Sequence, residues 1–266
     1  MAQMNTPLND PRRQRPRFHL EMDGTVMKIY GCVTMFFYTL SFTVIQNGLI
    51  HVNAFGPGEL SAAMEADPDL MLLSGWASVF QLVGGLPVPV FAFLLVEGFL
   101  HTSDFKRYLL TMLGFAIVSE PLFDFSRSGI WWDMTGQNVL FTYAVCLIML
   151  YGLRLLQEKK GVVFRLGQLM IVVSAALWTS LLQCNFGMGT VLLAAVYYLL
   201  YERKGMRVLI GAAVSILYVT APLSGYAIWN YNGQRGKLAE RYKYVFYALY
   251  PAHLLILGVI ARALAA

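Results

Sequence analysis

The chain has 266 residues, of which 58% are hydrophobic and only 13% are charged, and its formal net charge is +5. A soluble globular domain carries about 25% charged residues, so this composition excludes an ordinary soluble protein. The sequence instead predicts an all-α, polytopic membrane protein, a bundle of about eight transmembrane helices of which some are short or kinked.

The N-terminal segment differs from the rest of the chain. Residues 1–26 are basic and poor in helix formers, with Pro11, Pro16 and the arginines Arg12, Arg13, Arg15 and Arg17. They lack the apolar region and cleavage site of a secretory signal. We expect a basic cytoplasmic tail over 1–26 beside the lipid bilayer, then one integral membrane domain over 27–266. Nucleic acid is not an expected partner.

Apolar stretches that could cross a hydrocarbon core about 30 Å thick follow at 28–50, 74–100, 108–124, 137–155, 164–183, 187–201, 207–229 and 244–263. The stretches 108–124 and 187–201 are short, so we expect them to be tilted, re-entrant or partly unwound. Gly84, Gly85, Pro87 and Pro89 are expected to kink the long run that ends near Leu100.

The distribution of charge predicts an orientation. With the N-terminus inside, most Lys and Arg residues fall in cytoplasmic segments, and the acidic residues of the first outer loop are Glu59, Glu65, Asp67 and Asp69. Under the positive-inside rule, the N-terminus and the C-terminus are both expected to be cytoplasmic. A basic tail and short loops are typical of a multi-pass protein of a bacterial inner (cytoplasmic) membrane.

One connector does not fit this orientation. It places four basic residues on the nominal outside, namely Arg235, Lys237, Arg241 and Lys243. Either one upstream span has been counted in error, or these cations bind an anionic group. Asn232-Gly233 and Arg235-Gly236 are also typical of a plain tight turn.

Ionisable groups at membrane depth are costly and are candidates for function by default. Glu97 and His101 lie four residues apart, on one face of a helix. A carboxylate beside an imidazole is a usual arrangement for a general base. The alternative is a helix-end pair that only faces cytoplasmic headgroups.

A second set of polar residues is expected near the outer side. Glu120 and Asp124 share one helix face, where Pro121 should loosen the helix. They could share a proton, hold a cation or pair with a loop arginine, or form an ordinary helix terminus. Gln137 and Asn138 open the next span at the same depth, where amides are also common helix caps.

His253 lies about ten residues into the last span. A buried imidazole is costly unless it is hydrogen-bonded, so it is either a satisfied packing residue or a base reached from the outer side. The four histidines are dispersed, and neither they nor the cysteines show the spacing of a metal site. No metal is therefore expected.

Several blocks of the chain resemble the TraX family, membrane proteins named for a conjugation-associated acetylase of pilin. The blocks are PVFAFLLVEGFLHT over 89–102, SEP over 119–121 with Asp124, QNVLFT over 137–142, YNGQRG over 231–236 and YPAHLL over 250–255. They occur in the family's order and are specific when taken together. The matching polar residues are Glu97, His101, Glu120, Gln137, Asn138, Arg235 and His253.

The resemblance implies a membrane acyltransferase with acetyl-CoA as co-substrate and an amine or hydroxyl acceptor. The acceptor could be a pilin-like peptide N-terminus, a glycan or a lipid. We expect a catalytic base and its partner among His253, His101, Glu97 and Glu120. Residues expected to bind substrate or coenzyme, or to stabilise developing charge, are Asp124, Gln137, Asn138, Asn232 and Arg235.

The chain departs from the family pattern in its first span. Lys28 is present, but Tyr38 and Thr39 stand where the family has Asp and His, and Gly85 replaces an Arg. Acyl transfer would then need another base, such as His101 or His253. Two other hypotheses stay open: a transporter with a proton or cation path through Glu97, Glu120, Asp124 and His253, and a catalytically silent membrane scaffold.

Overall fold

The computed structural model describes residues 22–157, 161–236 and 242–265. Within these ranges the chain forms helices and no strand, so the expected all-α polytopic membrane architecture is confirmed. Six helical stretches are long and apolar enough to cross a membrane, fewer than the eight expected: Gly24–Ile50, Pro68–His101, Phe105–Ser128, Val139–Leu156, Val162–Leu181 and Tyr244–Ala265.

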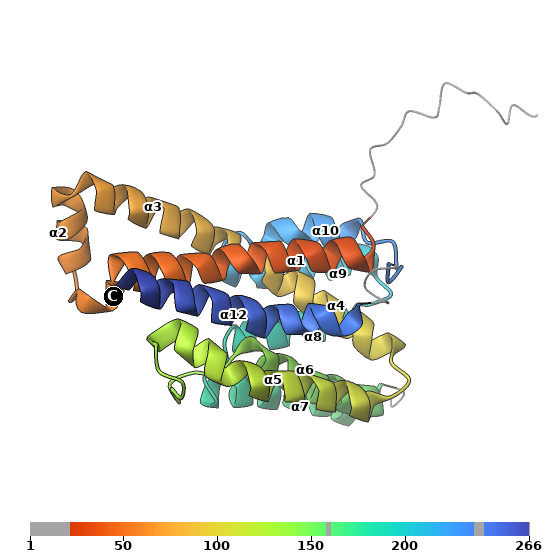
Figure 1. The fold of residues 1–266 in the computed structure, drawn as a ribbon. Helices are drawn as coiled ribbons and strands as arrows, with labels where there is room; N and C mark the ends of the chain where they lie inside the picture. Colours follow the sequence, from red (N-terminus) through yellow and green to blue (C-terminus); the bar gives the residue numbers. More distant parts are fainter. Residues whose placement is uncertain (1–21, 158–160, 237–241, 266) are drawn as a thin grey trace, which may run out of the picture.

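The helices run between two ends of the bundle, which we name after the ends of the described chain (Figure 1). The N-face holds the start of α1, and the C-face holds the end of α12. The described chain therefore begins at one face and ends at the other. This arrangement contradicts the expectation that both termini lie on the same side.

The first crossing consists of α1 (Gly24–Thr39) and the π-helix η2 (Leu40–Ile50). At the C-face, η3 (Val52–Ala54) and α2 (Glu59–Ala66) lead into α3 (Pro68–Val83). The chain returns to the N-face through α3 and α4 (Pro87–His101). Residues 84–86 interrupt this second crossing, as the glycine and proline pattern predicts.

Four antiparallel helices follow: α5 (Phe105–Ser128), α6 (Val139–Leu156), α7 (Val162–Leu181) and α8 (Gly187–Leu199). With 24 residues, α5 is a full span and is longer than the expected stretch 108–124. With 13 residues, α8 is too short to cross a hydrocarbon core alone. It begins inside the bundle, next to the interruption between α3 and α4.

The expected span over 207–229 does not cross the membrane, and this is the main error of the sequence-based topology. It forms α9 (Lys204–Ser215), η4 (Ile216–Tyr218), η5 (Ala221–Ser224) and α10 (Gly225–Trp229). The chain turns back at Val219, where φ is 56°, and α10 packs against α9. We call this returning segment the re-entrant hairpin.

The re-entrant hairpin explains the position of Arg235 in the basic connector that did not fit the predicted orientation; Lys237 and Arg241 lie outside the described residues. After α10 the chain lies beside the start of α1, where the Met22 N–H donates to the Asn230 carbonyl (3.1 Å) and the Asn232 N–H donates to the Met22 carbonyl (3.1 Å). Arg235 is therefore at the N-face, and α12 (Lys243–Ala265) crosses from there to the C-face. Of the two alternatives, the miscounted span is correct.

The three interrupted segments meet at one level inside the bundle. The Tyr218 hydroxyl donates to the Phe186 carbonyl (3.0 Å), just before α8, and the Ser224 hydroxyl donates to the Leu86 carbonyl (2.8 Å). The Thr220 hydroxyl donates to the Leu82 carbonyl. A Cβ at Gly85 would collide with the Tyr218 carbonyl oxygen, so only glycine permits this approach. Backbone groups freed at the breaks are thus satisfied within the protein.

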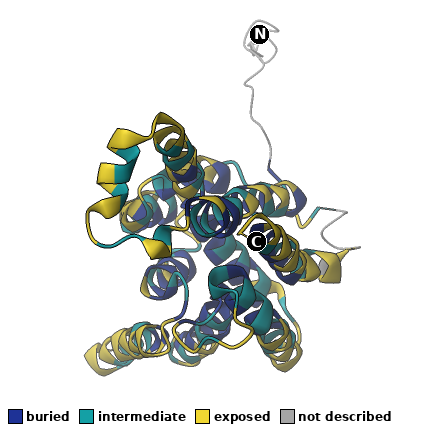
Figure 2. Cartoon of the chain, turned by 60° about the vertical axis from the view of Figure 1, so that its left-hand side comes forward, coloured by how far each residue is buried: buried dark blue, intermediate teal, exposed yellow. Residues whose placement is uncertain are grey.

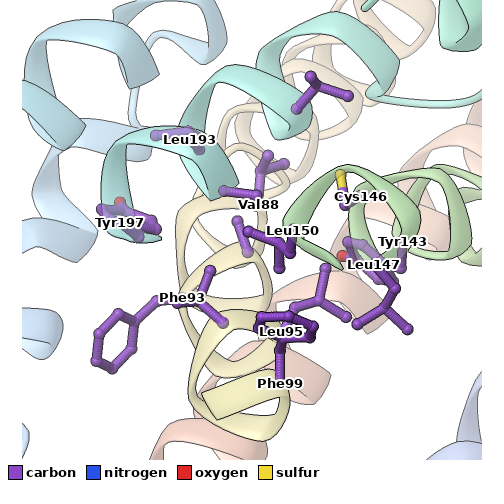
Figure 3. Packing of buried hydrophobic residues seen from close by; sticks show 14 of the residues in the cluster. Val88, Phe93, Leu95, Phe99, Tyr143, Cys146, Leu147, Leu150, Leu193 and Tyr197 are labelled. Atoms are coloured by element: carbon purple, nitrogen blue, oxygen red, sulfur yellow. The ribbon is translucent and has the colours of Figure 1, made fainter. Parts of the chain in front are cut away.

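The apolar core lies between α4, α6 and α8, where Figure 3 shows side chains of the three helices packed together. Phe93 and Phe99 of α4, Leu147 and Leu150 of α6 and Leu193 of α8 are fully buried. Exposed residues lie at the perimeter (Figure 2). Many of these are large and apolar, including Leu72, Leu110, Ile117, Leu166 and Ile256, as expected for a surface that faces lipid.

Polar side chains hold the connector 129–138 against α5 inside the bundle. One oxygen of Glu120 accepts the Asn138 N–H at 3.0 Å and also the Asn138 side-chain amide. That amide also donates to the Ala116 carbonyl (2.8 Å), and Asp124 accepts the Asp133 N–H at 2.9 Å. The connector therefore runs from the C-face into the bundle, and α6 begins inside the bundle and not at the C-face.

The topology can be tested by labelling single cysteines in a variant without Cys32, Cys146 and Cys184. Ser103→Cys and Gln234→Cys lie in N-face connectors, and Glu65→Cys lies in the C-face helix α2. We expect a membrane-impermeant maleimide to label the first two from the same side and Glu65→Cys from the other. All three should react after detergent solubilisation. Labelling of Gln234→Cys together with Glu65→Cys would mean that 207–229 crosses the membrane.

The contact between Glu120 and Asn138 predicts a loss of stability on substitution. Glu120→Leu leaves the Asn138 N–H and side-chain amide without this acceptor in a buried site. We expect the free energy of unfolding in detergent micelles to fall by about 2–4 kcal/mol, at about 1–3 kcal/mol per unpaired group. Glu120→Gln keeps an accepting oxygen and should lose less. An unfolding free energy equal to that of the wild type in Glu120→Leu would contradict this role.

Candidate functional site

A large cavity opens at the N-face between α1, α4, α5, α12 and the connector that follows α10. Its volume is about 700 Å³, within the range of small-molecule sites. Its mouth is lined by charged residues and its depth by apolar ones. The charged and imidazole groups are Lys28, Glu97, His101, Asp104, Arg107 and Arg235, and the apolar groups include Met35, Phe91, Leu94, Leu95, Met112 and Leu140.

Glu97 and His101 both line the N-face cavity and form the side-chain pair that their spacing predicts, although the closer partner of each is another group. The His101 ring donates from Nδ1 to the Glu97 backbone carbonyl at 2.9 Å, and the same nitrogen is 3.5 Å from the Glu97 carboxylate. The carboxylate instead accepts the Tyr201 hydroxyl at 2.8 Å. Burial, and next the bond to Glu97, raise the pKa of Tyr201 to about 12, so this hydroxyl stays protonated at neutral pH.

Arg235 is brought to the cavity by the backbone pairing of its connector with the start of α1. The Gly24 N–H donates to the Gln234 carbonyl (2.7 Å), and a Cβ at Gly24 would lie 2.7 Å from the Arg235 carbonyl oxygen. Asn232, also predicted to bind substrate, lies in this connector outside the cavity lining. Its side chain accepts the Gln234 N–H at 2.9 Å, which shapes the turn that presents Arg235.

A second cavity opens at the C-face and has a volume of about 390 Å³. Its polar lining consists of hydroxyls, amides and one cation: Tyr38, Thr39, Thr43, Ser126, Arg127, Thr135, Gln137, Tyr143, Gln183, Asn185 and Tyr250. Two connectors form this wall together, because Gln137 N–H donates to the Gln183 carbonyl (3.2 Å) and Asn185 N–H donates to the Gln137 carbonyl (2.8 Å).

The two cavities meet back to back in the interior of the bundle. Five side chains line both of them: Met35, Phe91, Val139, Tyr143 and Tyr250. We call this layer the septum. It comes from α1, α4, α6 and α12, so a group that enters from the N-face and one that enters from the C-face would face each other across single side chains.

The structure therefore separates the residues that the sequence grouped as one site. Glu97, His101 and Arg235 line the N-face cavity, and Gln137 lines the C-face cavity. Among the described residues, Glu120, Asp124 and Asn138 line neither cavity, and they hold the connector that carries Gln137. His253 also lines neither cavity, but it contacts Thr39, which does.

Sequence reasoning did not identify Thr39, Tyr143, Tyr201 or Tyr250 as candidates. Tyr250 lies in the YPAHLL block, which stands out in the sequence, and Thr39 lies outside the residues that the family model matches. Tyr143 and Tyr201 are aromatic residues in apolar helical sequence and carried no signal. In the described part of the chain, no group of three or more His, Cys, Asp or Glu residues could hold a metal ion.

Comparison with known proteins gives the family of the chain. The model of the TraX protein family matches residues 62–261, which include both cavities except for their walls on α1 and η2. A similar curated protein is the "Probable fimbrial assembly protein FimC, serogroup H1" of Dichelobacter nodosus, 25% identical over 205 residues, which cover 66% of this chain and 80% of that protein. No solved structure matches. Because the matched region contains most of the membrane domain, the chain belongs to the TraX family.

Proposed function

We propose that this protein is a membrane acyltransferase that takes acetyl-CoA at the N-face cavity and transfers its acetyl group to an amine or hydroxyl acceptor in the C-face cavity. The observation that carries the proposal is the pair of cavities that share the septum. Two substrates of different chemistry can each enter from one side, and they react where the cavities meet once a septum side chain rotates out of the way. Holding both reactants in place supplies much of the rate gain of such a transfer.

The N-face cavity suits a phosphorylated donor with a slender arm. Arg235, Lys28 and Arg107 lie at its mouth, where cations would bind the phosphates of coenzyme A. Leu94, Leu95 and other apolar side chains line the depth and would enclose the uncharged arm. The acetyl thioester would then reach the septum.

The charge distribution supports a cytoplasmic N-face, the side where acetyl-CoA is available. The described basic residues at the N-face include Lys28, Lys106, Arg107, Arg154, Arg165, Arg203, Lys204 and Arg235, whereas Arg127 and Arg262 lie toward the C-face. With the re-entrant hairpin in place of a span, Arg235 no longer violates the positive-inside rule. We therefore place the N-face in the cytoplasm and propose an inner-membrane location.

The C-face cavity suits the end of an exported molecule. Its volume of about 390 Å³ can take one residue or one sugar unit. Amides such as Gln137 and Asn185 could orient a peptide or a glycan by hydrogen bonds. The fimbrial-assembly name of the relative, together with the pilin acetylation that the sequence resemblance implies, favours the N-terminus of a pilin-like peptide.

The alternative of a proton or cation transporter receives less support. Its path required Glu120 and Asp124 to face a passage. In the described structure these carboxylates are 8% and 1% exposed, line neither cavity and accept hydrogen bonds from the connector 129–138. One oxygen of each carboxylate is accounted for in this way without transport, and the other, Glu120 Oε1 or Asp124 Oδ1, is buried without a hydrogen-bond partner.

The proposal predicts that Arg235 governs the affinity for the donor. With the protein in nanodiscs, transfer of labelled acetyl from acetyl-CoA to a pilin-like peptide would be compared between the wild type and Arg235→Ala. We expect the KM for acetyl-CoA to rise about tenfold and kcat to change little, because loss of a charge-assisted hydrogen bond costs about 1.5–3 kcal/mol.

Two controls define the result of that experiment. Arg165→Ala removes an exposed N-face cation outside the cavity lining and should leave the KM unchanged. A peptide with a blocked N-terminus distinguishes amine from hydroxyl acceptors. Wild-type protein that transfers acetyl to no peptide, glycan or lipid acceptor would refute the proposed function. An unchanged KM in Arg235→Ala would remove this residue from the donor site.

A further inference from the structure

A hydroxyl and an imidazole from opposite ends of the chain meet beside the C-face cavity. Thr39 is the last residue of α1, immediately before the π-helix η2, a helix type that is frequent at functional sites. Its Oγ1 is 3.0 Å from Nε2 of His253 in α12. Thr39 is 7% exposed and lines the C-face cavity, whereas His253 lies behind it.

The second ring nitrogen of His253 determines what the first can do. Nδ1 is 2.9 Å from the Leu249 carbonyl oxygen, which can only accept a hydrogen bond. Nδ1 therefore carries the hydrogen of the neutral ring, and Nε2 presents a lone pair to the Thr39 hydroxyl. A hydroxyl next to a base that a third group orients is the general pattern of an activated oxygen.

The position of Thr39 relative to the septum matches the proposed reaction. Met35 lies one helical turn earlier on α1, in the septum, and its carbonyl is the other acceptor within reach of the Thr39 hydroxyl, at 3.1 Å. His101 cannot serve here, because its 58% exposed side chain lies at the mouth of the N-face cavity. His253 reaches the C-face cavity through Thr39.

We infer, resting on the proposed acyl transfer, that Thr39 is the catalytic group that receives the proton of the acceptor and passes its own proton to His253. The acceptor nitrogen or oxygen forms a bond to the acetyl carbonyl carbon, and the carbon–sulfur bond of the thioester breaks, its electron pair leaving with sulfur. The acceptor's proton moves to Thr39 Oγ1 while the hydroxyl proton of Thr39 moves to His253 Nε2.

One proton is released on one side of the septum and one is taken up on the other, so the reaction is balanced. The imidazolium of His253 returns its proton through Thr39 to water in the C-face cavity, and the thiolate takes a proton from water in the N-face cavity. His253 acts as a positioning and proton-accepting residue behind Thr39. It thereby supplies, from the last span, a base that the first span of this chain lacks.

The test compares Thr39→Val, which has the same shape without the hydroxyl, with Thr39→Ser, which keeps the hydroxyl. We expect kcat to fall at least about 100-fold in Thr39→Val, the usual range for general acid–base groups, and to stay within about threefold in Thr39→Ser. The KM for acetyl-CoA should change little in both. Thr34→Val removes another buried α1 hydroxyl, bonded to the Tyr30 and Gly31 carbonyls and outside both cavities, and should keep full activity.

A spectroscopic measurement tests the pair without turnover. In ¹⁵N-histidine-labelled protein, with resonances assigned by His253→Gln, Nε2 of His253 should be unprotonated and hydrogen-bonded in the wild type and lose that bond in Thr39→Val. A proton on Nε2 would overturn the inference.

Two other results would overturn the inference and leave the proposed function standing. One is full activity of Thr39→Val in a protein whose wild type transfers acetyl. The other is mass-spectrometric detection of an acetyl group on Thr39. If the wild type transfers nothing, the proposed function and this inference fall together.

Discussion

In a membrane, a helix can be interrupted only where other parts of the protein take up the freed backbone groups. This protein meets that requirement at one level inside the bundle. Tyr218, Thr220 and Ser224 of the re-entrant hairpin donate to carbonyls beside the breaks at 84–86 and before α8. Because these contacts replace water, three incomplete crossings can coexist, and the rest of the structure depends on them.

The incomplete crossings create the space in which the site lies. Because α6 and α8 begin inside the bundle and not at the C-face, the connectors before them run into the bundle and form the wall of the C-face cavity. The bond between Glu120 and Asn138 holds the connector before α6 in this position. Since the hairpin returns to its own face, Arg235 reaches the N-face cavity. A bundle of complete spans would fill this volume with side chains, and the two cavities would not approach each other at a thin septum.

The polar residues at membrane depth therefore divide into two kinds. Glu120 and Asp124 accept backbone N–H groups of the connector 129–138, and the Asn138 side chain donates to the Ala116 carbonyl of α5. Thr39 and His253 are hydrogen-bonded to each other, and of the two only Thr39 lines the C-face cavity. Both kinds are costly to bury in isolation, which is why residue type and depth alone could not distinguish them in the sequence.

The sequence by itself determined the class of the molecule, the kink near Gly84, most of the spans and the ionisable residues at membrane depth, because hydrophobic length and rare buried charges are local properties. It did not identify Thr39. It did not determine which apolar stretch crosses. The stretch 207–229 has the length of a span, yet its turn near Val219 is held by carbonyls of Leu82 and Leu86, 138 residues away along the chain. The meeting of Thr39 with His253 spans 214 residues. Only tertiary packing brings such partners together. The topology of the hairpin, the septum and the arrangement of the site therefore follow from tertiary packing and not from the local sequence.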